Sequence, residues 1–98
     1  MFADDALLLD VREPAEWNAG HAPNAIHIPL GSIPERLKDL PIAAGVLPVV
    51  CRSGVRSAKA VEYLAAQGVQ AINVAGGMQA WEEAGKQLVG DSERPMVI

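Results

Sequence analysis

Short apolar runs, separated by polar stretches rich in glycine and proline, recur along the whole chain. Residues 7–11 read Leu-Leu-Leu-Asp-Val, an apolar run that ends at a polar boundary, as a strand buried on both faces of a sheet does. Similar runs predict three further strands, at residues 25–28, 46–50 and 69–74. Pro48 has no N–H to donate, so the third strand is expected to begin its pairing at Val49.

Helical patterns lie between these runs. Residues 57–67 carry apolar side chains at the i, i+3, i+4 spacing of one buried stripe, namely Ala58, Val61, Leu64 and Ala65. Gly68 follows as the stop signal. Shorter helices are predicted at residues 13–18, 33–40 and 78–84. Ser32 and Glu35 have the spacing of a capping box at the start of the second of these helices.

Strands that alternate with helices predict an α/β fold with a mainly parallel central sheet. Ligands bind such sheets at the carboxyl ends of their strands. The chain has 98 residues, half of them apolar and a fifth charged, without a linker or a repeat, so one domain is expected over residues 1–98. Residues 86–98 are less regular and predict an irregular tail, in which residues 96–98 could form a short edge strand.

The net charge of minus four argues against a nucleic-acid partner, which needs a basic face. No apolar run approaches the roughly 18 residues of a membrane span, and the first ten residues carry acids where a signal peptide would carry bases. A cytoplasmic protein without membrane contact is therefore expected. Cys51 is the only cysteine, so it cannot form an internal disulfide or a paired-cysteine metal site, and no metal is expected.

The one strongly basic stretch of the chain surrounds this cysteine. Residues 51–60 hold three basic side chains and no acid. Cys51 follows a predicted strand, and the stretch Arg52, Ser53, Gly54, Val55, Arg56, Ser57 leads into the longest predicted helix. In a tight strand-to-helix loop, inward-pointing N–H groups and the helix dipole stabilise an anion. The thiol of Cys51 is therefore expected to have a pKa below the free value of about 8.5.

Three blocks of the sequence resemble the signature blocks of single-domain rhodaneses, a family of sulfurtransferases. They are LLLDVREPAEWNAGHAPNAIHIP, CRSGVRS, and NVAGGMQAW with EEAG, in that order within residues 7–85. The resemblance implies a rhodanese-like three-layer fold. It also implies that Cys51 carries sulfur as a persulfide between a donor such as thiosulfate and an acceptor such as cyanide or a thiol. The loop residues 52–57 would bind the substrate, and no cofactor is implied.

The resemblance also assigns supporting roles and leaves some open. Asp10 and Arg12, with Glu16, match charged positions of the first block, where they look like an ion-pair network that braces the sheet. Arg56 could close the loop or bind the donor, whereas Arg52 could bind the donor or be only a solvated charge. A sulfur-relay protein is a possible partner.

Few residues precede the first block, so the sheet is expected to lack the outer strand that many rhodaneses have at this end. An uncovered edge invites pairing. Residues 96–98 could cover it within one chain, or by exchange with a second chain, which would make an edge-paired dimer instead of a monomer.

Two alternatives remain beside the sulfurtransferase. Rhodanese-like folds also occur as catalytically silent binding modules. A small cysteine phosphatase or arsenate reductase is a weaker alternative, because only four residues separate Cys51 from Arg56, one fewer than in the Cys-X5-Arg loop of phosphatases. A zinc set of His21, His27 and Cys51 has no paired spacing to support it, and a histidine at the position of His21 more often satisfies a turn than binds metal.

Overall fold

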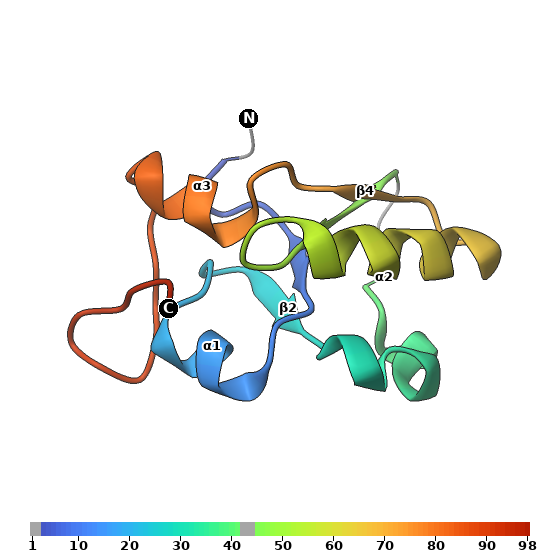
Figure 1. Cartoon of the computed structure of the whole chain (residues 1–98), viewed down its shortest axis with the longest axis horizontal. Coiled ribbons are helices and arrows are strands. Elements are labelled where there is room, and N and C mark those ends of the chain that lie inside the picture. The colour runs from blue at the N-terminus through green and yellow to red at the C-terminus, as the bar shows by residue number, and fades with distance from the viewer. Residues whose placement is uncertain (1–2, 42–44) are drawn as a thin grey trace.

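The computed structural model describes residues 3–41 and 45–98. Four parallel strands form one sheet in the order β2-β1-β3-β4. The strands are β1 (Leu8–Asp10), β2 (Ala25–His27), β3 (Leu47–Val50) and β4 (Ala71–Asn73), and each lies within one of the four predicted apolar runs. Helices flank the sheet (Figure 1). The α/β class with a parallel sheet is therefore confirmed.

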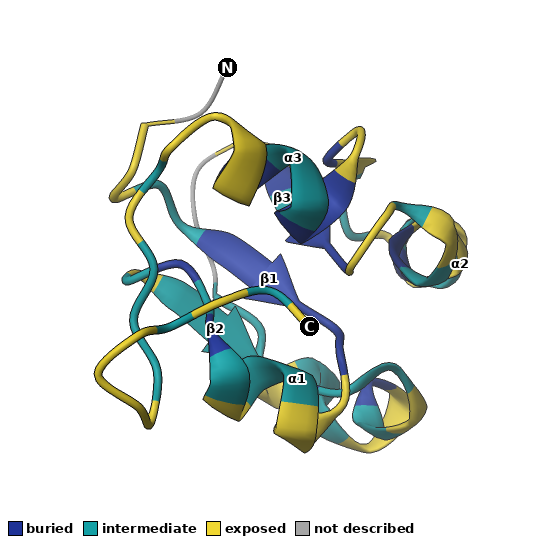
Figure 2. Cartoon of the chain, turned by 60° about the vertical axis from the view of Figure 1, so that its left-hand side comes forward, coloured by how far each residue is buried: buried dark blue, intermediate teal, exposed yellow. Residues whose placement is uncertain are grey.

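Side-chain alternation along the two central strands divides the core into two clusters. Leu9 and Val49 belong to one cluster, and their neighbours Leu8 and Val50 belong to the other. Successive residues of a strand point to opposite faces of the sheet. All four side chains are fully buried because both faces are covered. Figure 2 shows β1 and β3 as the buried centre of the molecule. A strand buried on both faces is what the unbroken apolar runs predict.

Each face of the sheet is covered by one main helix. α2 (Val55–Ala66) packs on the first cluster through Ala60 and Leu64. α3 (Gly77–Glu83) packs on the second through Met78 and Trp81. The short α1 (Pro14–Ala19) follows β1. Among the described residues, no helix is both long and apolar enough to cross a membrane.

Pro48 lies inside β3, so the expectation that pairing begins at Val49 is wrong on one side of the strand. The N–H of Leu47 donates to the carbonyl of Gln70, 3.0 Å away, and the register with β4 includes Pro48. In a parallel strand, alternate residues direct their backbone groups to alternate neighbours. The missing N–H of Pro48 falls on the side of β1, where pairing starts only at Val49.

The helix predicted at residues 33–40 is replaced by the 3₁₀ segment η2 (Pro34–Asp39), which follows a shorter 3₁₀ segment, η1 (Leu30–Ser32). Ser32 lies inside η1, so it is not an extended N-cap residue, and no side chain caps η2. Arg36 interrupts η2 with φ −118° and ψ 24°. The prediction of a capping box from Ser32 and Glu35 is therefore wrong.

The tail does not form the edge strand expected at residues 96–98. The edges of the sheet are β2 and β4, and the tail runs from α3 back to α1 (Figure 1). The N–H of Met96 donates to the carbonyl of Ala19 at 2.9 Å, one of the carbonyls that the last turn of α1 leaves without a helical partner. Val97 packs on the second core cluster. Cover of a sheet edge by the tail of the same chain is thus contradicted, whereas the oligomeric state stays a prediction.

Candidate active site

The single thiol lies at the carboxyl edge of the sheet, directly after β3. Cys51 is only 1% exposed. Its Sγ accepts a hydrogen bond from the N–H of Gly54 at 3.0 Å and lies 3.2 Å from the hydroxyl oxygen of Ser57. Gly54 adopts φ 116°, a left-handed conformation that allows the loop to turn back over the sulfur. Strand, loop and helix therefore follow one another in the predicted order, whereas anion binding by the loop stays a prediction.

The surroundings of the thiol favour its charged form. Burial raises the pKa of Cys51, but the hydrogen bonds from the Ser57 hydroxyl and from the backbone N–H groups of Ser57, Gly54 and Ser53 outweigh it. The net effect holds the pKa of Cys51 below that of an ordinary thiol. A larger share of Cys51 is therefore thiolate, the nucleophilic form, at neutral pH.

Hydrogen bonds from the first turn of α3 hold the backbone of the loop. The N–H of Met78 donates to the carbonyl of Cys51 at 2.8 Å, and that of Gln79 donates to the carbonyl of Arg52 at 3.0 Å. Gly77, with φ 58°, lies directly against these carbonyls, and a Cβ at this position would come 2.6 Å from the Arg52 oxygen. The second glycine of the NVAGG block thus allows α3 to approach the thiol loop, a link that sequence reasoning missed.

Arg56 faces a carboxylate of α1. Its Nη1 and Nη2 donate to the two oxygens of Glu16 at 2.6 Å and 2.8 Å. The hydrogen bond from Arg56 lowers the pKa of Glu16 from 4.5 to about 2, although partial burial opposes it. Glu16 was expected to belong with Asp10 and Arg12, but its direct partner is Arg56. The pair joins α1 to the first turn of α2, next to the thiol loop.

We expect Glu16→Gln to lose a pH-dependent part of the stability. Because the pKa of Glu16 is lowered in the folded state, its contribution is fully present above pH 4.5 and is lost as the pH falls towards 2. The free energy of unfolding should therefore be roughly 1 kcal/mol lower in the variant at neutral pH, with the gap closing in acid. Urea denaturation at a series of pH values measures this gap.

The control for this prediction is the same substitution in an Arg56→Gln background. Without the guanidinium, Glu16→Gln should change the free energy of unfolding by nearly the same amount at every pH. A gap of equal size at pH 6 and near pH 2 in the original background would contradict the assigned role of the pair.

Asp10 and Arg12 form a second ion pair, which is fully buried. Arg12 Nη2 lies 2.7 Å from Asp10 Oδ2 and also donates to the carbonyl of Gly20 at 2.7 Å. This guanidinium therefore joins the end of β1 to the end of α1. The supporting role expected for both residues stays a prediction.

Arg52 is held by the tail and by α3. It is exposed, and its Nε donates to the carbonyl of Ile98 at 3.0 Å. With the amide of Gln79 oriented to satisfy both groups, Gln79 Oε1 accepts from Arg52 Nη1 at 3.0 Å. Ser53 and Val55 are exposed beside it. Arg52 therefore contacts the tail. Among the hydrogen bonds of the described residues, none joins its guanidinium to the sulfur of Cys51.

Asn73 is a member of the site that sequence reasoning missed. It is the last residue of β4, and its Oδ1 lies 2.5 Å from the Ser57 hydroxyl oxygen. Its Nδ2 donates to the carbonyl of Gly54 at 2.9 Å. The signal available in the sequence was its place in the NVAGG block, at the carboxyl end of a predicted strand, where site residues of parallel sheets gather.

The family follows from comparison with known proteins. The family model described as a rhodanese-like domain matches residues 1–84. The chain belongs to the rhodanese family. A candidate sulfurtransferase of Bacillus subtilis is 46% identical to this rhodanese domain over 81 residues, which are 82% of this chain and 78% of that protein. A sulfurtransferase of Allochromatium vinosum is 40% identical over 87 residues, which are 88% of this chain and 80% of that protein.

A solved structure confirms the rhodanese fold. The rhodanese-like domain protein of Staphylococcus aureus has a TM-score of 0.77 and 44% sequence identity to this chain. The match covers 88% of this chain and 81% of that one. The three-layer rhodanese-like architecture implied by the sequence resemblance is therefore shown.

The histidines of this rhodanese domain do not gather around the thiol. Each stacks with Trp17, whose ring centroid lies 3.5 Å from that of His21 and 4.8 Å from that of His27. His21 Nδ1 lies 2.7 Å from the carbonyl of Trp17, and His27 Nε2 lies 2.7 Å from that of Arg12. Within residues 3–41 and 45–98, no group of three or more His, Cys, Asp or Glu side chains could hold a metal ion.

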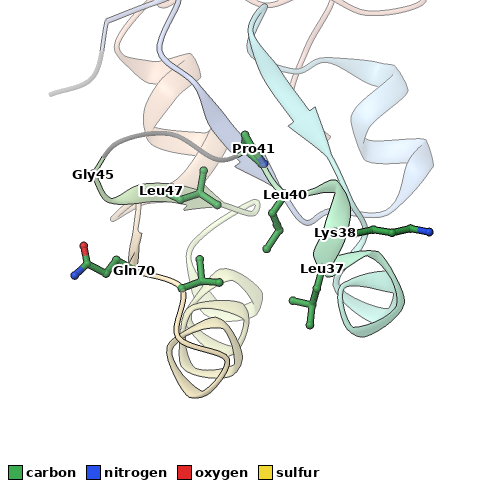
Figure 3. A pocket seen from close by; sticks show the side chains of 8 residues that line it. Leu37, Lys38, Leu40, Pro41, Gly45, Leu47 and Gln70 are labelled. Atoms are coloured by element: carbon green, nitrogen blue, oxygen red, sulfur yellow. The ribbon is translucent and has the colours of Figure 1, made fainter.

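An apolar hollow of about 320 Å³ lies at the other end of the rhodanese sheet (Figure 3). Leu37 and Leu40 line it together with Leu47, the first residue of β3. Cys51 follows the last residue of the same strand. The hollow is therefore separate from the thiol loop.

Proposed function

We propose that this rhodanese is a thiosulfate sulfurtransferase in which Cys51 carries sulfur as a persulfide. Relatives named as sulfurtransferases support sulfur transfer in general. The observation that carries the proposal for this chain is the environment of its only thiol, with Sγ 3.0 Å from the Gly54 nitrogen and 3.2 Å from the Ser57 oxygen. These donors stabilise a thiolate, which is the species that attacks a sulfur donor.

In the first step, the thiolate of Cys51 attacks the outer sulfur of thiosulfate. The new bond joins Sγ to that sulfur, and the bond between the outer sulfur and the central sulfur breaks. The bonding electrons leave with sulfite. Three negative charges enter the step and three leave it, one on the terminal sulfur of the persulfide and two on sulfite, so no proton or oxidant is needed.

In the second step, cyanide or a thiolate attacks the terminal sulfur of the persulfide. The sulfur–sulfur bond to Cys51 breaks, and its electrons restore the thiolate of Cys51. The products are thiocyanate, or a persulfide on the acceptor thiol. Because the enzyme is modified by one substrate and restored by the other, ping-pong kinetics follow.

The terminal sulfur would be held by backbone N–H groups of residues 52–56, in the loop that α3 fixes from below. Only a small part of Cys51 is exposed, which favours a donor that presents one terminal sulfur atom. Arg52, Arg56 and Lys59 place positive charge around the loop and would attract a dianionic donor. Since Arg56 binds Glu16, its main part in this proposal is to hold the loop closed.

Intact-protein mass spectrometry tests the proposal most directly. The reduced chain is measured under non-reducing conditions before and after addition of thiosulfate, with Cys51→Ala as control. The expected result is a gain of one sulfur atom that the control lacks and that cyanide reverses with release of thiocyanate. No gain with thiosulfate or with mercaptopyruvate would refute the proposal and leave a silent binding module or a phosphatase-like loop.

The partners follow the same proposal. A small sulfur donor and a thiol or cyanide acceptor are sufficient for both steps, and a sulfur-relay protein could supply or accept the sulfur instead. The cytoplasmic location and the single domain over residues 1–98 stay predictions of the sequence.

A further inference from the structure

The hydroxyl of Ser57 lies between two acceptors. Its oxygen is 3.2 Å from Cys51 Sγ and 2.5 Å from Asn73 Oδ1. Ser57 is fully buried, so water does not replace either contact. A serine hydroxyl carries one hydrogen and can donate it to only one of the two neighbours at a time. The direction of this single hydrogen therefore depends on which neighbour accepts more strongly.

The orientation of the Asn73 amide is fixed by a third group. Asn73 Nδ2 lies 2.9 Å from the carbonyl oxygen of Gly54, which can only accept a hydrogen bond. The amide nitrogen must therefore face Gly54, and the amide oxygen must face Ser57. Since the amide oxygen has no hydrogen, the contact of 2.5 Å exists only when Ser57 donates to Asn73.

We propose that Asn73 is a positioning residue that accepts the Ser57 hydrogen when Cys51 Sγ is uncharged and yields it to Sγ when the thiolate forms. The hydrogen stays on the Ser57 oxygen throughout, and only the direction of the O–H bond changes. A thiolate is a charged acceptor and competes well against an amide oxygen, whereas an uncharged sulfur is a weak acceptor.

This competition has a definite sign. When Ser57 turns to the thiolate, Asn73 Oδ1 loses its donor and faces the lone pairs of the Ser57 oxygen. Asn73 therefore stabilises the uncharged state of Sγ relative to the thiolate. If the proposed persulfide forms, its inner sulfur is also uncharged and its negative charge lies on the terminal sulfur. On the basis of that proposed function, Asn73 would then stabilise the sulfur-loaded form relative to the empty thiolate.

The test is a titration of Cys51 that needs no sulfur donor. Because the chain has one cysteine, the ultraviolet absorbance of the thiolate against pH reports Cys51 alone, after subtraction of the Cys51→Ala curve. Asn73→Ala should lower the pKa of Cys51 by about half a unit to one unit, the equivalent of one hydrogen bond. Ser57→Ala should raise it, because the thiolate loses a donor.

The double variant separates two ways in which Asn73 could act. If Asn73 acts through Ser57, Asn73→Ala should produce no shift in the Ser57→Ala background. A shift of the same size in that background would mean that Asn73 acts only by holding the Gly54 carbonyl, and would overturn the proposal. An unchanged or raised pKa in Asn73→Ala alone would overturn it as well.

Gln70→Ala serves as the matched control, because Gln70 is an exposed amide just before β4, at the end remote from the loop. It should leave the titration of Cys51 unchanged. The titration is independent of persulfide formation, so its failure and the failure of the mass-spectrometric experiment are distinguishable. Thermal melts of each variant show whether the fold is retained.

Discussion

Gly77→Ala should lower the free energy of unfolding by about 3 kcal/mol or more. A Cβ at this position would collide with the carbonyl carbon and oxygen of Arg52, 2.7 Å and 2.6 Å away, and with the carbonyl oxygen of Cys51. These are backbone atoms, which cannot rotate aside as the end of a side chain can. The same carbonyls accept the hydrogen bonds from Met78 and Gln79. Chemical denaturation should show this loss of stability. We also expect Cys51 to accept sulfur from a donor less readily in the variant.

Gly85→Ala is the matched control for that variant. Gly85 also has a positive φ, of 73°, but a Cβ there would meet no heavy atom within 4 Å. It therefore isolates the cost of a left-handed conformation, about 1–2 kcal/mol, from the cost of the collision. Equal losses in the two variants would show that the close approach of Gly77 to the thiol loop has little energetic weight.

Asp10→Asn should cost about 3–5 kcal/mol of stability, because it leaves the buried guanidinium of Arg12 without a countercharge. Both side chains are completely buried. Among the described residues, Arg12 Nη1 already has no hydrogen-bond partner, so the guanidinium depends on Asp10 and on the carbonyl of Gly20. Urea denaturation at neutral pH gives the free energy directly.

A surface ion pair provides the comparison. Arg36 Nε lies 3.0 Å from Asp39 Oδ2, and each side chain is 43% exposed. Asp39→Asn should therefore cost less than about 1 kcal/mol. A similarly small loss in Asp10→Asn would mean that Arg12 keeps adequate solvation without the carboxylate, against the present interpretation.

The strands and the thiol loop could be predicted because their signals are local. An apolar run such as residues 7–11 indicates burial on both faces, and a cysteine between such a run and a helix indicates an anion-binding loop. The 3₁₀ segments were missed for a local reason too. Ser32 and Glu35 have the spacing of a capping box, but Ser32 already belongs to the preceding 3₁₀ turn. Its N–H donates to the carbonyl of Pro29 at 2.8 Å.

The contacts that complete the site could not be predicted, because they join segments far apart in the sequence. Glu16 and Arg56 lie on different helices, and their contact depends on how α1 and α2 are placed around the sheet. Asn73 reaches Ser57 only because β4 lies beside β3. No spacing rule relates such residues, so a charged or amide side chain in each place has many equally plausible partners.

The strand order has a consequence for the folding pathway. The central partners Leu9 and Val49 are 40 positions apart (49 minus 9), so the middle of the sheet forms only after a long segment has closed. Non-local pairing of this kind slows folding. Until β1, β3 and α3 have assembled, the sulfur of Cys51 lacks the burial that it has in the folded chain. During synthesis, Cys51 leaves the ribosome before Gly54 and Ser57, so the hydrogen bonds to its sulfur form only after residues later in the chain have emerged.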